Sequence, residues 1–230
     1  MNYKNLFFDL DDTLWAFSIN ARDTFEELYY KHGLDASFDS FAHFYSLYQQ
    51  RNTELWIEYG DGQITKEELN SQRFLFPLEA VGAGDSVLAE AYSNDFFAMI
   101  PLKKRLMPHA VEVLEYLSSR YNLYILSNGF RELQYQKMRS GGIDGYFKQV
   151  ILSDDIGVMK PWPAIFNYAL SATQSELRES LMIGDSWDAD IIGANGVGMR
   201  QAFYNVVGRT YFPFRPTYEL KDLKELTELL

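Results

Sequence analysis

The segment Leu6-Phe7-Phe8-Asp9-Leu10-Asp11-Asp12-Thr13 places a short apolar run directly before a cluster of carboxylates. The apolar run shows no polar alternation, which predicts a strand of a parallel sheet covered on both faces. Near the end of a strand, residues two apart point roughly the same way, so Asp9 and Asp11 can share one small volume. Two carboxylates that close repel each other unless a cation or a shared proton relieves them. The segment therefore predicts a strand that delivers an acidic pair to the edge of a sheet.

Further apolar runs predict more strands, each followed by polar or glycine residues. They occupy residues 123–126, 150–152 and 181–183, with a fifth candidate at 201–204. Helical patterns separate the later runs. We expect helices that begin at Pro108, span Phe130 to Arg139, begin at Pro161, and span Asp188 to Asn195. Strands that alternate with helices predict a doubly wound, Rossmann-like α/β core with a parallel sheet.

One long interval breaks this alternation. Between Trp15 and Ile100 the sequence shows helical patterns but no clear strand pattern. The apolar stripes at helical spacing are Ala21, Phe25, Leu28 and His32, then Phe41, Phe44, Tyr45 and Tyr48, then Val87, Leu88, Ala91 and Tyr92. We therefore expect residues 1–14 and 101–230 to form the core, and residues 15–100 to form an inserted α-helical domain.

Composition limits the classes of function. The chain has 230 residues, 47% of them hydrophobic, which is enough for a packed core with an insertion. It has no cysteine, no secretory leader pattern and no apolar run of the ~18 residues that a membrane helix needs, so we expect a cytoplasmic protein without a membrane partner. The net charge of -11 would repel a nucleic-acid polymer. A small phosphate ester could bind if a cation inverts the local field. The oligomeric state stays open.

Polar residues follow the predicted strands at their carboxyl ends, where open α/β sheets place their sites. The set is Asp9, Asp11, Ser127, Asp185 and, somewhat later, Asp190. Each residue alone could be a turn or capping residue, but their convergence predicts a site. A hard divalent cation with oxygen ligands would relieve the acidic pair, and Mg²⁺ suits a phosphate site. A calcium-binding hand loop does not fit, because Leu14 and Asn20 occupy its glycine and terminal glutamate positions.

Four segments resemble, in order, the motifs of phosphatases of the haloacid dehalogenase superfamily. Asp9-Leu10-Asp11-Asp12-Thr13 resembles the DxDxT first motif, Ser127 the second, and Lys160 before Pro161 the third. Gly184-Asp185-Ser186-Trp187-Asp188-Ala189-Asp190 resembles the acidic fourth motif. One such motif arises easily by chance, whereas four in the family's order are specific. The resemblance implies that the insertion is a helical subclass I cap, which closes over the site and selects the leaving group.

The resemblance also implies roles for the residues. Asp9 would be the nucleophile that forms an aspartyl phosphate. Asp11 would protonate the leaving alkoxide and then deprotonate the water that hydrolyses the intermediate. The residues implied around the phosphate are Thr13, which would orient the first aspartate, Ser127, the backbone amide of Asn128, and Lys160, which would screen the charge.

The implied Mg²⁺ site has carboxylate and carbonyl ligands. It would comprise the Asp9 carboxylate, the Asp11 backbone carbonyl and the Asp185 carboxylate, with Asp190 acting through water or as a supporting partner. Asp188 fits the family spacing less well. The dehalogenating enzymes lack an acid at the position of Asp11, so this residue favours phosphoryl transfer. Phosphomutases share all four motifs and stay an alternative.

The motif neighbourhoods also resemble a narrower group, the pyrimidine 5'-nucleotidases that act on noncanonical nucleoside monophosphates. The similar segments are Phe8 to Trp15, Ser127 to Phe130 and Gly157 to Pro161. Trp15 and Trp187 are candidates for stacking on a substrate base, although aromatic residues are more often part of a core. Sugar phosphates are the main alternative substrates.

A non-enzymatic alternative is a phosphoaspartate receiver module for signalling, which also combines an acidic pair, a hydroxyl residue and a lysine. A receiver of ordinary size has no room for an insertion of more than 80 residues after the first acidic pair. The sequence contains no Gly-x-Ser-x-Gly elbow, which disfavours a serine hydrolase, and no Gly-Lys dipeptide, which excludes an ATP-binding P-loop. His32, His43 and His109 show no metal-ligand spacing.

Overall fold

The computed structural model describes residues 2–230, and the chain forms two compact units. Unit 1 comprises the chain up to Phe17 together with Lys104–Leu230, and unit 2 comprises Ser18–Lys103. Trp15 forms an isolated antiparallel bridge with Leu106, and the backbone N–H of Ala16 donates to the carbonyl of Arg105. These contacts keep residues 15–17 with unit 1, although the sequence analysis placed the start of the insertion at residue 15.

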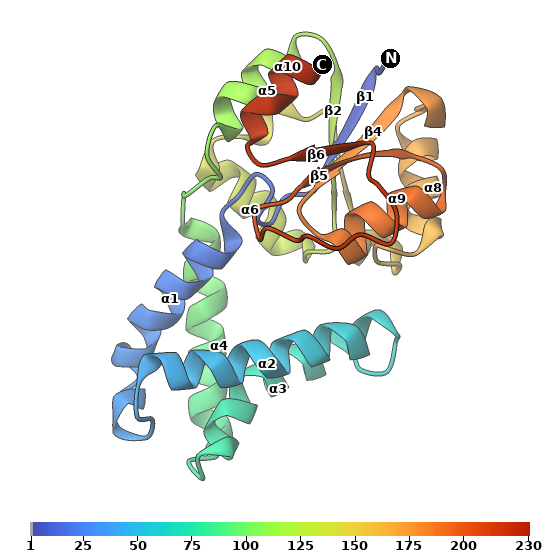
Figure 1. Cartoon of the computed structure of the whole chain (residues 1–230). Coiled ribbons are helices and arrows are strands. Elements are labelled where there is room, and N and C mark those ends of the chain that lie inside the picture. The colour runs from blue at the N-terminus through green and yellow to red at the C-terminus, as the bar shows by residue number, and fades with distance from the viewer. Residues whose placement is uncertain (1) are drawn as a thin grey trace. The chain divides into compact units, whose positions relative to one another are not determined.

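Unit 1 is built on a six-stranded parallel sheet (Figure 1). Its strands are β1 (Asn5–Phe8), β2 (Asn122–Ser127), β3 (Gln149–Leu152), β4 (Ser180–Gly184), β5 (Arg200–Tyr204) and β6 (Tyr218–Leu220). Their spatial order is β3-β2-β1-β4-β5-β6. The five strands expected from the sequence are all present, whereas the short β6 was missed. The predicted doubly wound α/β fold is confirmed.

Helices cover both faces of this sheet. They are α5 (Ala110–Ser118), α6 (Arg131–Gly141), α7 (Ser153–Ile156), α8 (Pro163–Ala172), α9 (Ile192–Gly196) and α10 (Leu226–Leu229). Figure 1 shows α5 and α10 on one face and α8 and α9 on the other. Side chains of β1, β2, β3 and β4 pack with α8 and α9 in one buried cluster of Phe7, Tyr124, Leu126, Ile151, Ile165, Phe166, Ala169, Met182, Ala194 and Met199. Burial on both faces explains why the strands lack polar alternation.

Several helix starts differ from the expectation, and the helix expected from Pro108 begins at Ala110. The helix expected from Pro161 begins at Pro163, where the missing N–H of a proline costs nothing in a first turn. The segment expected as one helix from Asp188 begins as a π-helical turn, Trp187–Ile191, and continues as α9. The π turn carries two residues of the fourth motif, and such turns are frequent at functional sites.

Unit 2 consists of helices around an aromatic core. They are α1 (Phe17–Lys31), which begins at the last residue of unit 1, α2 (Phe41–Gly60), α3 (Lys66–Ala80) and α4 (Ser86–Met99). Phe25 is fully buried, and its ring lies 4.1 Å from that of Tyr48 and 4.5 Å from that of Phe96, measured between centroids. The sequence analysis missed α3. It placed the apolar face of α4 only partly correctly, because Tyr92 is buried as expected, whereas Val87 is 75% exposed and Ala89 and Phe96 are buried instead.

The sheet register brings three strand ends to one level. Phe8 of β1 pairs with Ile125 of β2 and with Ile183 of β4. The residues that follow these strands therefore leave the sheet at the same edge, on both sides of β1. Among residues 2–230, no helix is both long and apolar enough to cross a membrane.

The aromatic core of unit 2 gives a prediction about stability. Phe25→Ala should lower the free energy of unfolding by roughly 3–5 kcal/mol, because a large buried ring leaves a cavity. Urea titration followed by far-UV circular dichroism measures this. Tyr30→Ala, in the same helix at a side chain that is 60% exposed, is the control and should change it by less than about 0.5 kcal/mol. Similar effects of the two substitutions would contradict the assigned core.

Candidate active site

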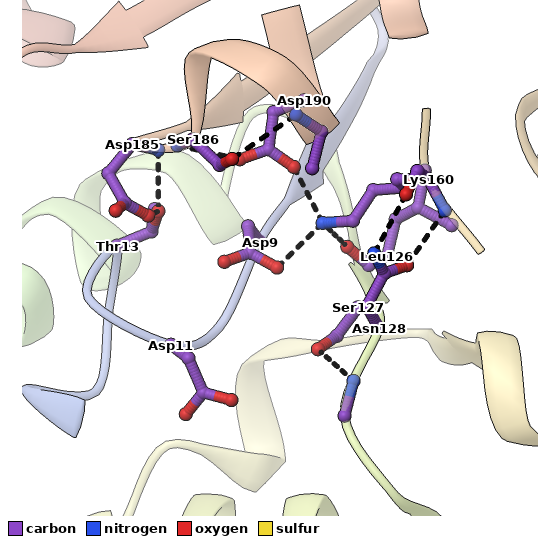
Figure 2. A network of polar contacts seen from close by, with 12 residues as sticks. Asp9, Asp11, Thr13, Leu126, Ser127, Asn128, Lys160, Asp185, Ser186 and Asp190 are labelled. Carbon is purple, nitrogen blue, oxygen red and sulfur yellow. Dashed lines mark hydrogen bonds and ion pairs between the residues drawn. The ribbon is translucent and has the colours of Figure 1, made fainter. Parts of the chain in front are cut away.

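Lys160 lies at the centre of the site, between carboxylates of the first and fourth motifs. Its ammonium donates to Asp9 Oδ1 at 2.7 Å, to Asp190 Oδ1 at 2.6 Å and to the carbonyl of Leu126 at 2.7 Å (Figure 2). Burial alone would lower the pKa of Lys160, but the charges of Asp190 and Asp9 together outweigh burial and raise that pKa. The charged ammonium therefore ties β1, β2 and the turn after β4 together.

Three carboxylates face one small space. Asp9, Asp185 and Asp190 each offer an oxygen, and these oxygens lie within 4.8 Å of one another. Burial, reinforced by Asp190 and opposed by Lys160, raises the pKa of Asp9 from 3.8 to about 7. Burial and the charges of Asp9 and Asp190 raise the pKa of Asp185 to about 8. A single lysine does not compensate three carboxylates, of which Asp9 and Asp190 are buried and Asp185 is half-buried, and an added cation would relieve them.

The donor set at this space fits a hard divalent cation. The available groups are carboxylate oxygens, which Mg²⁺ and similar ions prefer. Asp190 uses Oδ1 on Lys160 and accepts the backbone N–H of Ser186 on Oδ2 at 3.1 Å. Because both of its oxygens are already bonded, Asp190 suits a supporting role better than that of a direct ligand. The Asp9 and Asp185 carboxylates remain the better candidate ligands.

Thr13 connects the first motif to the fourth. Its hydroxyl donates to Asp185 Oδ1 at 2.8 Å and accepts the backbone N–H of Asp185 at 3.0 Å (Figure 2). The hydroxyl proton is therefore committed to the carboxylate in this structure. Thr13 is buried, so it fixes the Asp185 side chain from inside the fold.

Gly184 makes room for Asp190 at the end of β4. A Cβ atom at Gly184 would lie 2.2 Å from Asp190 Oδ2, which is far inside contact distance. The absence of a side chain is therefore what lets the carboxylate fold back over the strand end towards Lys160. This requirement explains the glycine that precedes Asp185 in the fourth motif.

Ser127 and Asn128 follow β2 and make different contacts. Ser127 Oγ accepts the backbone N–H of Gly129 at 3.1 Å and the Gln134 amide at 2.7 Å. The side chain of Asn128 donates to the carbonyl of Lys160 at 2.9 Å and accepts its N–H at 2.8 Å. Asn128 thus clamps the backbone that carries the lysine. Ser127 keeps its hydroxyl proton for another acceptor.

Asp11 is held by two residues that the sequence analysis did not select. Lys137 donates to both oxygens of its carboxylate, at 2.8 Å and 3.0 Å, and Gln134 donates to Oδ2 at 2.9 Å. Figure 2 shows the Asp11 carboxylate directed away from that of Asp9. Hydrophobic periodicity gives no signal for this pair, because α6 buries Gln134 and Lys137 more fully than its apolar neighbour Leu133.

The two tryptophans considered as base-stacking candidates are packed inside unit 1. Trp15 is fully buried, and the structure places the Lys137 ammonium 5.0 Å from its ring centroid. Trp187 packs against Phe203, Phe212 and Phe214, and Arg209 lies over its ring at 5.1 Å. In this structure both rings are core residues, and neither presents a free face.

Comparison with known proteins assigns the same family as the motif order. Residues 3–198 match the haloacid dehalogenase-like hydrolases. The chain is 33% identical to the pyrimidine 5'-nucleotidase YjjG of Escherichia coli, covering 100% of this chain and 99% of that protein. It is 30% identical to the pyrimidine 5'-nucleotidase PynA of Streptococcus pneumoniae, covering 100% and 96%.

A solved structure extends the likeness to the whole fold. The crystal structure of the HAD-hydrolase YfnB of Bacillus subtilis, described as bound to magnesium and as revealing interdomain movement, superposes with a TM-score of 0.89. Its sequence is 27% identical, and the alignment covers 100% of this chain and 99% of that one. With four motifs converging on one sheet edge and full-length relatives of the same kind, the chain belongs to the haloacid dehalogenase-like hydrolase family.

Proposed function

We propose that this hydrolase is a Mg²⁺-dependent phosphomonoesterase that works through an aspartyl phosphate on Asp9. The observation that carries the proposal is the placement of Asp9 at the centre of the sheet edge. Its carboxylate touches a buried, charged Lys160 and shares a buried space with Asp185 and Asp190. A carboxylate held in this way can approach an anionic phosphoryl group, because neighbouring positive charge offsets their repulsion.

The proposed reaction has two half-reactions. In the first, an Asp9 oxygen attacks phosphorus, the bond between phosphorus and the ester oxygen breaks, and Asp11 gives its proton to the departing alkoxide. In the second, water attacks the phosphorus of the aspartyl phosphate, Asp11 takes a proton from that water, and the bond to Asp9 breaks. Inorganic phosphate leaves, and both aspartates return to their starting state.

The remaining residues bind and orient. Lys160 would neutralise charge between Asp9 and the phosphoryl oxygens. Ser127, whose oxygen already accepts two hydrogen bonds, would donate its hydroxyl proton to a phosphoryl oxygen. Asp9, the Asp11 carbonyl and Asp185 would hold Mg²⁺, supported by Asp190. When bound, the ion supplies a Lewis acid that draws the phosphoryl group towards Asp9 and stabilises charge in the transition state.

The substrate class follows from the relatives and belongs to the same proposal. YjjG and PynA, both named pyrimidine 5'-nucleotidases, align with all of this chain, including the helical unit of residues 18–103. We take pyrimidine nucleoside monophosphates, including noncanonical ones, as the substrates, and we assign the helical unit the role of the substrate-selecting cap. Sugar phosphates are the competing class.

The nucleophile can be tested with a matched pair of aspartates. Asp9→Asn should lower phosphate release by roughly 10³- to 10⁶-fold, the range seen when a covalent nucleophile is removed. Asp188→Asn is the control, because Asp188 lies in the fourth motif with a side chain that is 82% exposed. That variant should keep activity within a few-fold. Phosphate release by Asp9→Asn at the level of the control would exclude Asp9 as the nucleophile.

Metal binding should depend on pH. In the metal-free protein the pKa values of Asp9 and Asp185 lie at about 7 and about 8, above their ordinary 3.8. The stability that proton uptake by these groups contributes is complete below about pH 4 and is lost as the pH rises through 7 to 8. Mg²⁺ binds the deprotonated groups, so its stabilising effect should grow over the same interval.

Thermal unfolding with Mg²⁺ and with chelator measures this effect. At one fixed Mg²⁺ concentration, ~100 times the Kd at pH 8, the increase in Tm should be small near pH 5.5 and reach about 5 °C or more near pH 8. Asp185→Asn should remove the increase at every pH. An increase that stays constant or shrinks as the pH rises would contradict the assigned ligands.

A phosphate-release panel tests the substrate class. It should compare pyrimidine monophosphates, purine monophosphates, sugar phosphates and flavin mononucleotide, each with Mg²⁺ and with chelator. We expect kcat/KM for the pyrimidine nucleotides to exceed that for the other classes by about 10-fold or more, the scale of one or two well-placed contacts. Highest activity on hexose phosphates would exclude the nucleotidase assignment and leave the reaction class intact. Activity that survives complete chelation would exclude the metal.

A further inference from the structure

Two residues of α6, Gln134 and Lys137, bind the carboxylate of Asp11, and neither belongs to the four motifs. We propose that Lys137, assisted by Gln134, is a positioning residue that holds Asp11 as the general base for hydrolysis of the aspartyl phosphate. The inference rests on the proposed function, in which Asp11 serves both half-reactions. It adds a residue of α6 to the machinery and assigns it to one of the two steps.

All three contacts to the Asp11 carboxylate come from donors. The Lys137 ammonium reaches Oδ1 at 2.8 Å and Oδ2 at 3.0 Å, and the Gln134 amide nitrogen reaches Oδ2 at 2.9 Å. An ammonium has no acceptor, so Lys137 can only donate to the two oxygens of Asp11. The arrangement therefore orients both Asp11 oxygens as hydrogen-bond acceptors, which is the role that a general base has towards water in the second half-reaction.

Lys137 is fixed in place by its surroundings. The side chain is 4% exposed, and its ammonium lies 5.0 Å from the ring centroid of Trp15 and 4.9 Å from that of Phe17. Aromatic faces attract a cation, so the two rings and the carboxylate define one position for it. These contacts to the Lys137 ammonium therefore restrict the positions that the Asp11 carboxylate can take.

Gln134 joins the general base to the residue proposed to bind phosphate. One amide nitrogen donates to Asp11 Oδ2 and to Ser127 Oγ, the latter at 2.7 Å. Because the carboxylate can only accept, the nitrogen must face it, and Gln134 Oε1 is left buried with no hydrogen-bond partner among residues 2–230. Gly129 provides the space, since a Cβ there would lie 2.2 Å from the same nitrogen.

Stability alone does not account for this arrangement. A buried ion pair is usually no more stabilising than apolar residues of the same volume, and an unpaired buried carbonyl is unfavourable. Helix α6 nevertheless buries a lysine and a glutamine at positions three apart, directly against Asp11. Polar groups that are buried without a clear gain in stability point to a functional use. Among the contacts of Lys137 with residues 2–230, Asp11 is the only side chain proposed to be catalytic.

The test separates the two half-reactions with p-nitrophenyl phosphate, whose leaving group needs little help from an acid. Lys137→Met keeps the length of the side chain and removes its charge. We expect hydrolysis of the acid-quenched phosphoenzyme to slow by about 10- to 100-fold, which is part of the roughly 10²- to 10⁴-fold that general base catalysis contributes, because Asp11 itself is retained. Because kcat/KM reports the steps up to phosphorylation, kcat and KM should fall together while kcat/KM changes by only a few-fold.

Three further variants complete the experiment. Asp11→Asn should show the same accumulation of phosphoenzyme, and adding Lys137→Met to it should have little further effect, since both act on one group. Lys137→Arg should restore part of the hydrolysis rate. Arg131→Met is the control, because Arg131 lies on the same helix, is exposed and pairs with Asp155; its kinetics should match those of the unchanged enzyme.

The outcomes distinguish this inference from the proposed function. Equal losses of kcat and kcat/KM in Lys137→Met, with no drop in KM and no phosphoenzyme, would overturn the positioning role, as would unchanged kinetics. The fall in KM does not depend on the folded fraction of the sample, so partial misfolding cannot imitate it. If neither the unchanged enzyme nor Asp11→Asn forms a phosphoenzyme, the proposed function itself fails.

Discussion

The ammonium of Lys160 is the interaction on which the site depends. It bonds to Asp9 after β1, to the carbonyl of Leu126 in β2 and to Asp190 in the turn after β4. These three segments are neighbours only because β1 lies between β2 and β4 in the sheet. Without the lysine, buried carboxylates would face one another with no internal counterion. The strand order and the charge of the site therefore both depend on the Lys160 ammonium. The side chain of Asn128 holds the Lys160 backbone with two hydrogen bonds.

Around this cation, the residues that the sequence identifies only as one set of motifs make different contacts. Thr13 fixes Asp185, Asn128 fixes the Lys160 backbone, and Gly184 leaves space for Asp190. The Ser127 oxygen accepts two hydrogen bonds, and its hydroxyl proton stays available for an acceptor. Rigid placement by neighbouring groups is what allows electrostatic catalysis without reorganisation during the reaction. Several residues of the motifs thus serve to position the side chains of other motif residues.

The sequence predicted the core well because its signals are local. Continuous apolar runs end at carboxylates, and the order of four motifs placed Asp9, Asp185 and Lys160 at one sheet edge. What it could not predict depends on three-dimensional packing. Helix α3 contains Pro77, which is typical of a helix break, although the Thr65 and Glu68 capping box marks its start. Hydrophobic periodicity gives no signal for the burial of Lys137, which depends on its contacts with Asp11 and with the rings of Trp15 and Phe17.

The central place of β1 has a consequence for how the chain folds during synthesis. β1 precedes both of its partners in the sequence and pairs with residues 122–125 on one side and residues 180–183 on the other. Neither partner has been made when β1 leaves the ribosome, and pairings of such long sequence separation form slowly. The acidic pair of this strand therefore meets its partners late, so nascent chains carry no assembled site until the fourth motif emerges.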